Sequence, residues 1–210
     1  RSTLFPYTTL FRSMESSETA VNVPTLFKMS IDQLLLNDDD LPVFIPVICE
    51  FLMNFSNSVG IFRLCGNHAM IQDLGVIFNL PECAVPPCAS VYDVSSFMKQ
   101  WLRDLPEPLV SPDLLNELYD PDNDDSIVTL LRNLPKTNRK CLASIFAVIQ
   151  LVIDQSSVNQ MAPANIVTCF VSSFLQNSKG LKRHIPFLRF FNATMKYIND
   201  NGDDFVLPCE

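Results

Sequence analysis

One arginine in the sequence stands where it could recognise a phosphate group. Arg63 lies in the short segment 60–66, which glycines bound at both ends and whose apolar Ile61, Phe62 and Leu64 can pin a loop to a core. A guanidinium stays charged, and its donors form a planar fork that matches phosphate oxygens. The segment therefore predicts an exposed cation on a rigid loop. The residues alone leave a second interpretation open, a surface arginine paired with a carboxylate.

A second pair of cations follows further along the chain. Lys99 and Arg103 are four residues apart, a spacing that places both on one face of a helix. Trp101 and Leu102, between them, are expected to turn inward. On spacing alone the pair is either part of a binding surface or a solvated basic edge.

The common catalytic and metal-binding motifs are absent. The chain has no GxxxxGK[ST] phosphate loop and no GxSxG elbow, and His68 and His184 have no close cysteine or histidine partner. Seven scattered cysteines indicate reduced thiols rather than a disulfide framework. The acidic run 120–125 lacks the glycine and the terminal glutamate of an EF-hand loop. We therefore expect neither a metal nor a resident cofactor.

Composition favours an all-α domain. The 210 residues are 48% hydrophobic, with 5 glycines against 15 prolines, and long alternating segments typical of strands are missing. A formal net charge of -8 argues against nucleic acid and against an anionic membrane surface as partners. The longest apolar run, 141–153, is too short to span a membrane and is expected to be a core helix.

The chain is expected to consist of a leader, one domain and a tail. Residues 1–13 resemble the in-frame translation of a sequencing-adapter primer, and Met14 follows directly, so we exclude them from the fold. We expect a flexible N-terminus over 14–22, a single domain over 23–199 and a C-terminal tail over 200–210.

Caps and prolines predict the helices that carry the candidate residues. Asn67 and Asp93 are suitable N-caps, and Pro106 and Pro108 end the helix that follows Asp93. Helices are expected over 42–54, 68–79, 94–105, 112–119, 126–133, 137–155, 163–175 and 184–199.

Four blocks of sequence resemble the signature of the Rho GTPase-activating protein (RhoGAP) domain. The blocks are GIFRLCG at 60–66, FMKQWLRDLPEPL at 97–109, NLP at 133–135 and NQMAPAN at 159–165. They occur in the family's order and spacing, and the resemblance covers about Val23 to Asn199. The segment 156–161 is most similar to the subgroup that contains the T-cell-activation RhoGAP protein.

The resemblance implies a single-domain helical bundle of about eight or nine helices, and it implies a function. Members of this family accelerate GTP hydrolysis by Rho-family small GTPases and do not themselves bind or hydrolyse GTP. Arg63 matches the arginine finger, which acts in trans. Lys99 and Arg103 match the basic pair that contacts the GTPase and braces the finger loop, and Asn165 matches the asparagine near the switch region. Asn159 is a further candidate for a GTPase contact.

The implied partner is a Rho-family GTPase in its GTP-bound form, which would supply both the GTP and the magnesium. No cofactor, no nucleic acid and no membrane span are expected. We expect a cytoplasmic monomer that the GTPase recruits to the inner face of the membrane.

Three positions depart from the family pattern. Val59 precedes Gly60 where an acidic residue is usual, Gln160 stands where a lysine is common, and Ser172 replaces a proline, which should loosen the end of its helix. None of these changes removes a cation from the site, which favours a competent activator. They leave open a RhoGAP-like module that binds a GTPase or another protein as a scaffold without activating it. The leader and the end at residue 210 suggest a third possibility, a hybrid or truncated product that does not fold stably.

Overall fold

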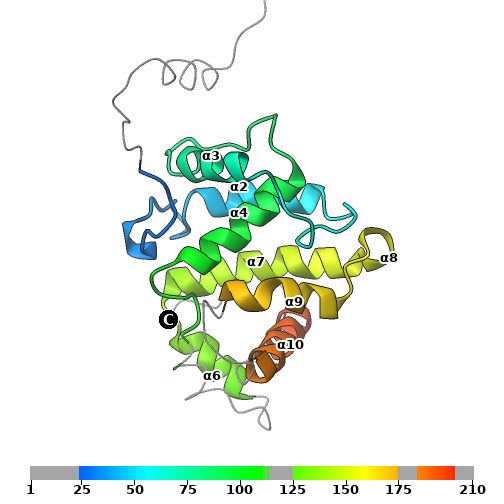
Figure 1. The fold of residues 1–210 in the computed structure, drawn as a ribbon. Coiled ribbons are helices and arrows are strands. Elements are labelled where there is room, and N and C mark those ends of the chain that lie inside the picture. The colour runs from blue at the N-terminus through cyan, green and yellow to red at the C-terminus, as the bar shows by residue number, and fades with distance from the viewer. Residues whose placement is uncertain (1–23, 112, 114–124, 175–183, 202–210) are drawn as a thin grey trace, which may run out of the picture.

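A computed structural model describes residues 24–111, 113, 125–174 and 184–201 (Figure 1). This part of the chain contains eight α-helices, one 3-10 helix and no strand, only an isolated antiparallel bridge between Leu36 and Pro42. The elements are η1 (Ile31–Gln33), α2 (Phe44–Asn54), α3 (His68–Ile77), α4 (Val91–Asp104), α6 (Asp125–Asn133), α7 (Lys136–Asp154), α8 (Ser156–Asn159), α9 (Pro163–Phe174) and α10 (His184–Asn201). The predicted all-α fold is confirmed.

Helix α3 begins as predicted, whereas α4 does not. The Asn67 side-chain oxygen accepts hydrogen bonds from the backbone N–H groups of Ala69 and Met70, at 2.9 and 3.4 Å, and so caps α3. The prediction that Asp93 caps α4 is wrong, because the helix begins at Val91. Ser90 is the N-cap, and Asp93, in the first turn, completes a reciprocal capping box with it.

Other expectations fall partly outside the described residues. The helix expected over 112–119 and the acidic run 120–125 lie outside them, except for Asp113 and Asp125. The same holds for the leader over 1–13, the N-terminus over 14–22 and the tail beyond 201. The short helix α8 was not predicted.

Helix α7 runs through the middle of the bundle (Figure 1). It contacts α2 on one side and α10 on the other, and α9 lies along it. Its buried residues lie within the run 141–153 that predicted a core helix. None of the helices in the described part is long and apolar enough to cross a membrane.

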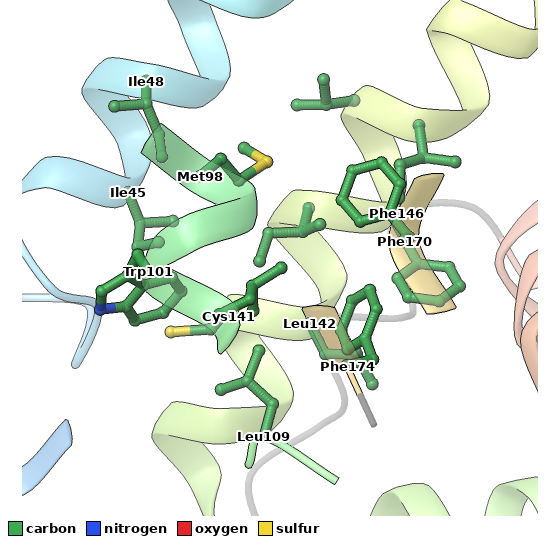
Figure 2. Packing of buried hydrophobic residues seen from close by; sticks show 14 of the residues in the cluster. Ile45, Ile48, Met98, Trp101, Leu109, Cys141, Leu142, Phe146, Phe170 and Phe174 are labelled. Carbon is green, nitrogen blue, oxygen red and sulfur yellow. The ribbon is translucent and has the colours of Figure 1, made fainter. Parts of the chain in front are cut away.

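Helix α4 packs against α2, α3 and α9, and this fixes the direction of its remaining face. Met98 and Trp101 point into the core near Ile45 of α2 and Leu142 of α7, with Phe170 of α9 beyond them (Figure 2). Trp101 and Leu102 are both buried, as predicted. Because these side chains fill the core, the face that carries Lys99 and Arg103 must turn away from the centre.

Candidate functional site

The Arg63 loop, defined here as residues 58–66, forms a tight turn between α2 and α3. The backbone N–H groups of Arg63 and Leu64 both donate to the carbonyl oxygen of Gly60, each at 2.9 Å. Gly60 has φ +73°, a left-handed conformation that glycine adopts at no steric cost. The turn leaves the Arg63 side chain exposed to solvent.

Phe62 anchors the loop in the core. It has φ 66°, which is unfavourable for a bulky side chain, yet its ring is fully buried 4.8 Å from the ring of Phe170 on α9. Ile61 is also fully buried. The predicted pinning of the loop is therefore confirmed for these two residues and wrong for Leu64, which is 45% exposed.

Lys99 joins α4 to the loop beside Arg63. Its ammonium group donates to the carbonyl oxygen of Phe62, which directly precedes Arg63. Burial lowers the pKa of Lys99 below its ordinary value, and the charge of Arg103 lowers it further, while Cys169 and Cys65 act in the opposite direction. Arg103 lies in the last turn of α4 and is exposed. Lys99 is thus committed to the loop, whereas Arg103 is open to solvent.

The first turns of α4 hold the far end of the loop. The backbone N–H of Gly66 donates to Ser96 Oγ at 3.0 Å, and that of Asn67 donates to Asp93 Oδ1 at 2.6 Å. A side chain on Gly66 would come within 2.5 Å of the Asp93 backbone. Burial acts to raise the pKa of Asp93, but hydrogen bonds from Ser90 and from the Asn67 backbone outweigh it and hold this pKa below its ordinary value.

Tyr92 holds the near end of the loop. Its hydroxyl donates to the carbonyl oxygen of Val59 at 3.1 Å. Sequence reasoning missed Tyr92, Asp93 and Ser96 as residues that support the loop. The serine and aspartate spacing of the capping box signals only a helix start, because nothing local shows that the same aspartate also reaches another segment.

Asn159 is a buried bracket rather than a surface residue. Its side-chain nitrogen donates to the carbonyl oxygens of Ser56 and Val152, at 2.8 and 2.7 Å, and its side-chain oxygen accepts from the Met161 N–H at 2.8 Å. Its own carbonyl accepts from the N–H of Gly60 at 2.8 Å. Because Asn159 is 0% exposed, the predicted contact with a GTPase is wrong. Through these bonds Asn159 joins α8 to Val152 of α7, to Ser56 after α2 and, at Gly60, to the Arg63 loop.

Asn165 lies near the surface at the start of α9. Its side-chain nitrogen donates to the carbonyl oxygen of Gln160 at 3.2 Å, and Gln160 ends α8 in a left-handed conformation with φ 62°. Ser172 is exposed inside α9, which continues to Phe174. The helix end that this serine was expected to loosen borders residues 175–183, which lie outside the described part.

The cations of the loop and of α4 gather near α9. Arg63 and Lys99 both act electrostatically on the Cys169 thiol, whose pKa is raised by burial against their influence. Within the described residues no carboxylate lies within ion-pair distance of Arg63, which disfavours the interpretation of a paired surface arginine. The same residues contain no group of three or more potential metal ligands. In the described part of the chain the site is therefore a small cationic surface on which Arg63 forms no ion pair.

Comparison with protein families identifies the class to which this fold and site belong. Residues 42–179 match the RhoGAP domain, and this range includes the Arg63 loop, α4 and α9. The chain therefore belongs to the RhoGAP family.

Several curated relatives and solved structures are similar to this chain. Rho GTPase-activating protein gacY of Dictyostelium discoideum is 29% identical over 182 residues, which are 80% of this chain and 25% of the relative. Human Rho GTPase-activating protein 20 is 30% identical over 173 residues, 78% of this chain and 14% of the relative. The chain thus spans a quarter or less of the length of these two proteins.

The fold matches solved structures as well. The crystal structure of human Rho GTPase activating protein 15 superposes with a TM-score of 0.72 at 20% sequence identity, covering 94% of this chain and 97% of that one. The BH domain from Graf, the GTPase regulator associated with focal adhesion kinase, matches with a TM-score of 0.60 at 21% identity, covering 78% and 94%.

Proposed function

We propose that this domain accelerates GTP hydrolysis by a GTP-bound Rho-family GTPase, with Arg63 inserted in trans beside the nucleotide. The observation that carries the proposal is an exposed Arg63, which pairs with no carboxylate of the described residues, on a loop fixed by Lys99, Asn159 and α4. A loop held in this way needs little rearrangement to present its arginine to a phosphate, so the cost of ordering the backbone has been met during folding.

The positive charge of Arg63 acts where negative charge develops in the reaction. In phosphoryl transfer, charge builds on the transferring group, and a guanidinium placed there lowers the barrier. For small GTPases an arginine supplied in trans contributes about 10³ to 10⁵ in rate. The GTPase supplies the GTP, the magnesium and the attacking water, so this chain needs no cofactor and hydrolyses no GTP alone. It acts as a monomer in the cytoplasm, at the membrane face where the GTPase resides.

Arg103 and Asn165 are the surface residues that would meet the GTPase beside the finger. Arg103 is exposed one helical turn after Lys99, and Asn165 is half-exposed at the start of α9. Lys99 has a different role, because its ammonium group is bonded to Phe62. It positions the loop and does not itself need to touch the partner.

Single-turnover GTP hydrolysis on a panel of Rho-family GTPases tests this function, with the full chain as activator. We expect the unmutated chain to stimulate at least one GTPase, and Arg63→Ala to reduce the stimulated rate about 10³-fold or more. Binding to the GTP-loaded partner should persist, because the finger acts mainly in the transition state. Arg132→Ala, which removes an exposed arginine from α6, is the matched control and should leave the rate unchanged.

The scaffold interpretation makes the opposite prediction. A chain that binds GTP-loaded GTPase without changing its hydrolysis rate would be a binding module, with Val59 and Gln160 as the departures to examine first. Failure of the unmutated chain to stimulate any GTPase of the panel would contradict the proposed activity.

A further inference from the structure

Exposed apolar side chains gather around the Arg63 loop. Seven large hydrophobic side chains are strongly exposed in the described part of the chain, and three of them, Leu35, Leu36 and Leu80, lie elsewhere in the sequence. The other four are Phe55 at 45%, Val59 at 46%, Leu64 at 45% and Val158 at 53% exposed. We call these four residues the apolar rim.

Backbone contacts bring three members of the rim together. Val59 adjoins Gly60, and the Leu64 side chain lies 3.0 Å from the position that a Cβ on Gly60 would occupy. The Gly60 N–H donates to the carbonyl of Asn159 at 2.8 Å, and Val158 is the residue before Asn159. Val59, Leu64 and Val158 thus all lie within a few residues of the hydrogen bond between Gly60 and Asn159, although Val158 comes from a distant part of the sequence.

Phe55 joins the rim at the end of α2. Its ring packs 4.8 Å from that of Phe51, and its carbonyl accepts from the N–H of Ser58, the first residue of the loop, at 3.0 Å. The next residue, Ser56, is bonded to the side chain of Asn159. The bonds of Asn159 to Ser56 and Gly60 therefore fix the backbone beside Phe55 and Val59, and Val158 directly precedes Asn159.

The position of the guanidinium decides what must cover the rim. A terminal nitrogen of Arg63 lies 3.5 Å from the Cβ position of Gly60, so the guanidinium stands over the same turn as the rim. A protein whose phosphate reaches Arg63 brings the surface around that phosphate over this turn, beside Val59 and Leu64. Val59 also occupies a place where an acidic residue would set a negative charge beside that phosphate.

We propose that the apolar rim is a docking surface for apolar side chains that border the nucleotide of a GTP-bound Rho-family GTPase. This inference rests on the proposed function, and it assigns to Val59, Leu64 and Val158 a share of the affinity that Arg63 does not provide. Exposed apolar side chains that a partner covers release water and stabilise the complex in proportion to the apolar area buried. They contact no reacting atom, so they should stabilise the bound state and the transition state equally.

Single-turnover hydrolysis measured against activator concentration tests the rim. For Leu64→Ser/Val158→Ser we expect the concentration that gives the half-maximal rate to rise about tenfold, the change for about 1.4 kcal/mol of lost binding. The saturating rate should stay within about twofold, because uniform binding is lost and transition-state stabilisation is kept. Val158→Ser alone, which leaves the loop sequence intact, should give a smaller rise. Leu36→Ser/Leu80→Ser is the matched control and should change neither quantity.

The possible outcomes distinguish a failure of the proposed docking surface from a failure of the proposed arginine finger. An unchanged half-maximal concentration in the double variant, with Arg63→Ala still inactive, overturns the rim and leaves the proposed function intact. A fall in saturating rate for Val158→Ser also overturns it, since that residue would then shape the loop. If the unmutated chain stimulates no GTPase, the proposed function fails, and direct binding to GTP-loaded GTPases then tests whether the rim is a docking surface. Weaker binding of the double variant supports the docking surface, and equal or absent binding overturns it. A change in self-association of the chain would identify a second copy as the occupant and overturn the proposal.

Discussion

Two loops of this domain each accept a hydrogen bond from a lysine ammonium group, but the other contacts that hold the two loops differ. In the Arg63 loop the Lys99 ammonium donates to the carbonyl of Phe62, and in the turn 37–42 the Lys140 ammonium donates to the carbonyl of Asp39. Each loop also contains a non-glycine residue with positive φ, Phe62 at 66° and Asp40 at 57°. The contacts look alike, but their surroundings do not.

The turn 37–42 has its own local hydrogen bonds, and its contacts with α7 lie at the surface. The Asn37 side-chain oxygen accepts from the N–H groups of Asp39 and Leu41, each at 3.0 Å, and an aspartate such as Asp40 adopts positive φ at little cost. An exposed ion pair of 2.7 Å joins Asp40 to Lys136, and this contact lowers the pKa of Asp40. Such a turn needs little from the rest of the fold.

The Arg63 loop depends on distant segments instead. Phe62 has an unfavourable φ that the core must offset, and the loop is bonded to α4 and to Asn159. Buried tertiary contacts hold the functional loop, whereas local hydrogen bonds hold the surface turn and its contacts with Lys136 and Lys140 of α7 are exposed.

Removing the Phe62 ring should give the largest difference in stability between a change in the Arg63 loop and a change in the turn 37–42. Phe62→Ala leaves a cavity against Phe170 and keeps the positive φ, so we expect the free energy of unfolding to fall by about 3–5 kcal/mol. Asp40→Gly, the matched change in the surface turn, should leave the midpoint of denaturant unfolding unchanged. Equal effects of the two variants would contradict the comparison. The cooperative transition that this measurement requires also tests whether the chain folds stably.

Removing the buried bracket is expected to have the next largest effect. Asn159→Ala leaves the carbonyls of Ser56 and Val152 and the N–H of Met161 without their partner, so we expect a loss of about 3 kcal/mol in unfolding free energy. Asn165→Ala removes one bond near solvent and should cost less than about 1 kcal/mol. If the two asparagines proved equally important for stability, Asn159 would not be the bracket described here.

The two lysines should differ in the pH dependence of stability. The pKa of Lys99 in the fold lies below its ordinary 10.5, so the unfolded chain binds more protons over the interval between these values. Stability contributed by this group therefore rises as pH increases through the folded pKa. We expect the unmutated chain to gain stability relative to Lys99→Met as pH is raised from neutral toward 10, measured by denaturant unfolding at each pH.

The matched variant is Lys140→Met, which removes the corresponding bond to Asp39 at the surface. It should leave the free energy of unfolding at neutral pH unchanged within experimental error, since exposed polar contacts contribute little. Lys99→Met should in addition slow stimulated hydrolysis at saturating activator, because it frees the carbonyl beside Arg63. A flat difference between the unmutated chain and Lys99→Met across pH would argue that the ammonium is fully solvated.

Much of the fold was predictable because its signals are local. Asn67 caps α3 through bonds to the next few residues, and the run 141–153 is apolar enough to identify a core helix without further context. The start of α4 was missed because serine and aspartate both favour the N-cap, and only the reciprocal bonds show that Ser90 holds that place.

The cations of the site could be predicted from the sequence, but the residues that hold the Arg63 loop could not. The sequence by itself determined an all-α chain, an arginine between apolar anchors, and a lysine and arginine on one helical face, because these follow from composition and short spacing. Only the tertiary structure decided that Leu64 faces solvent, that Asn159 is buried and that the Lys99 ammonium bonds to Phe62. The side chain of Asn159 meets Ser56 across 103 residues of sequence. Contacts at that separation depend on how α2, α4, α7 and α9 pack together, and no local pattern of residues encodes them.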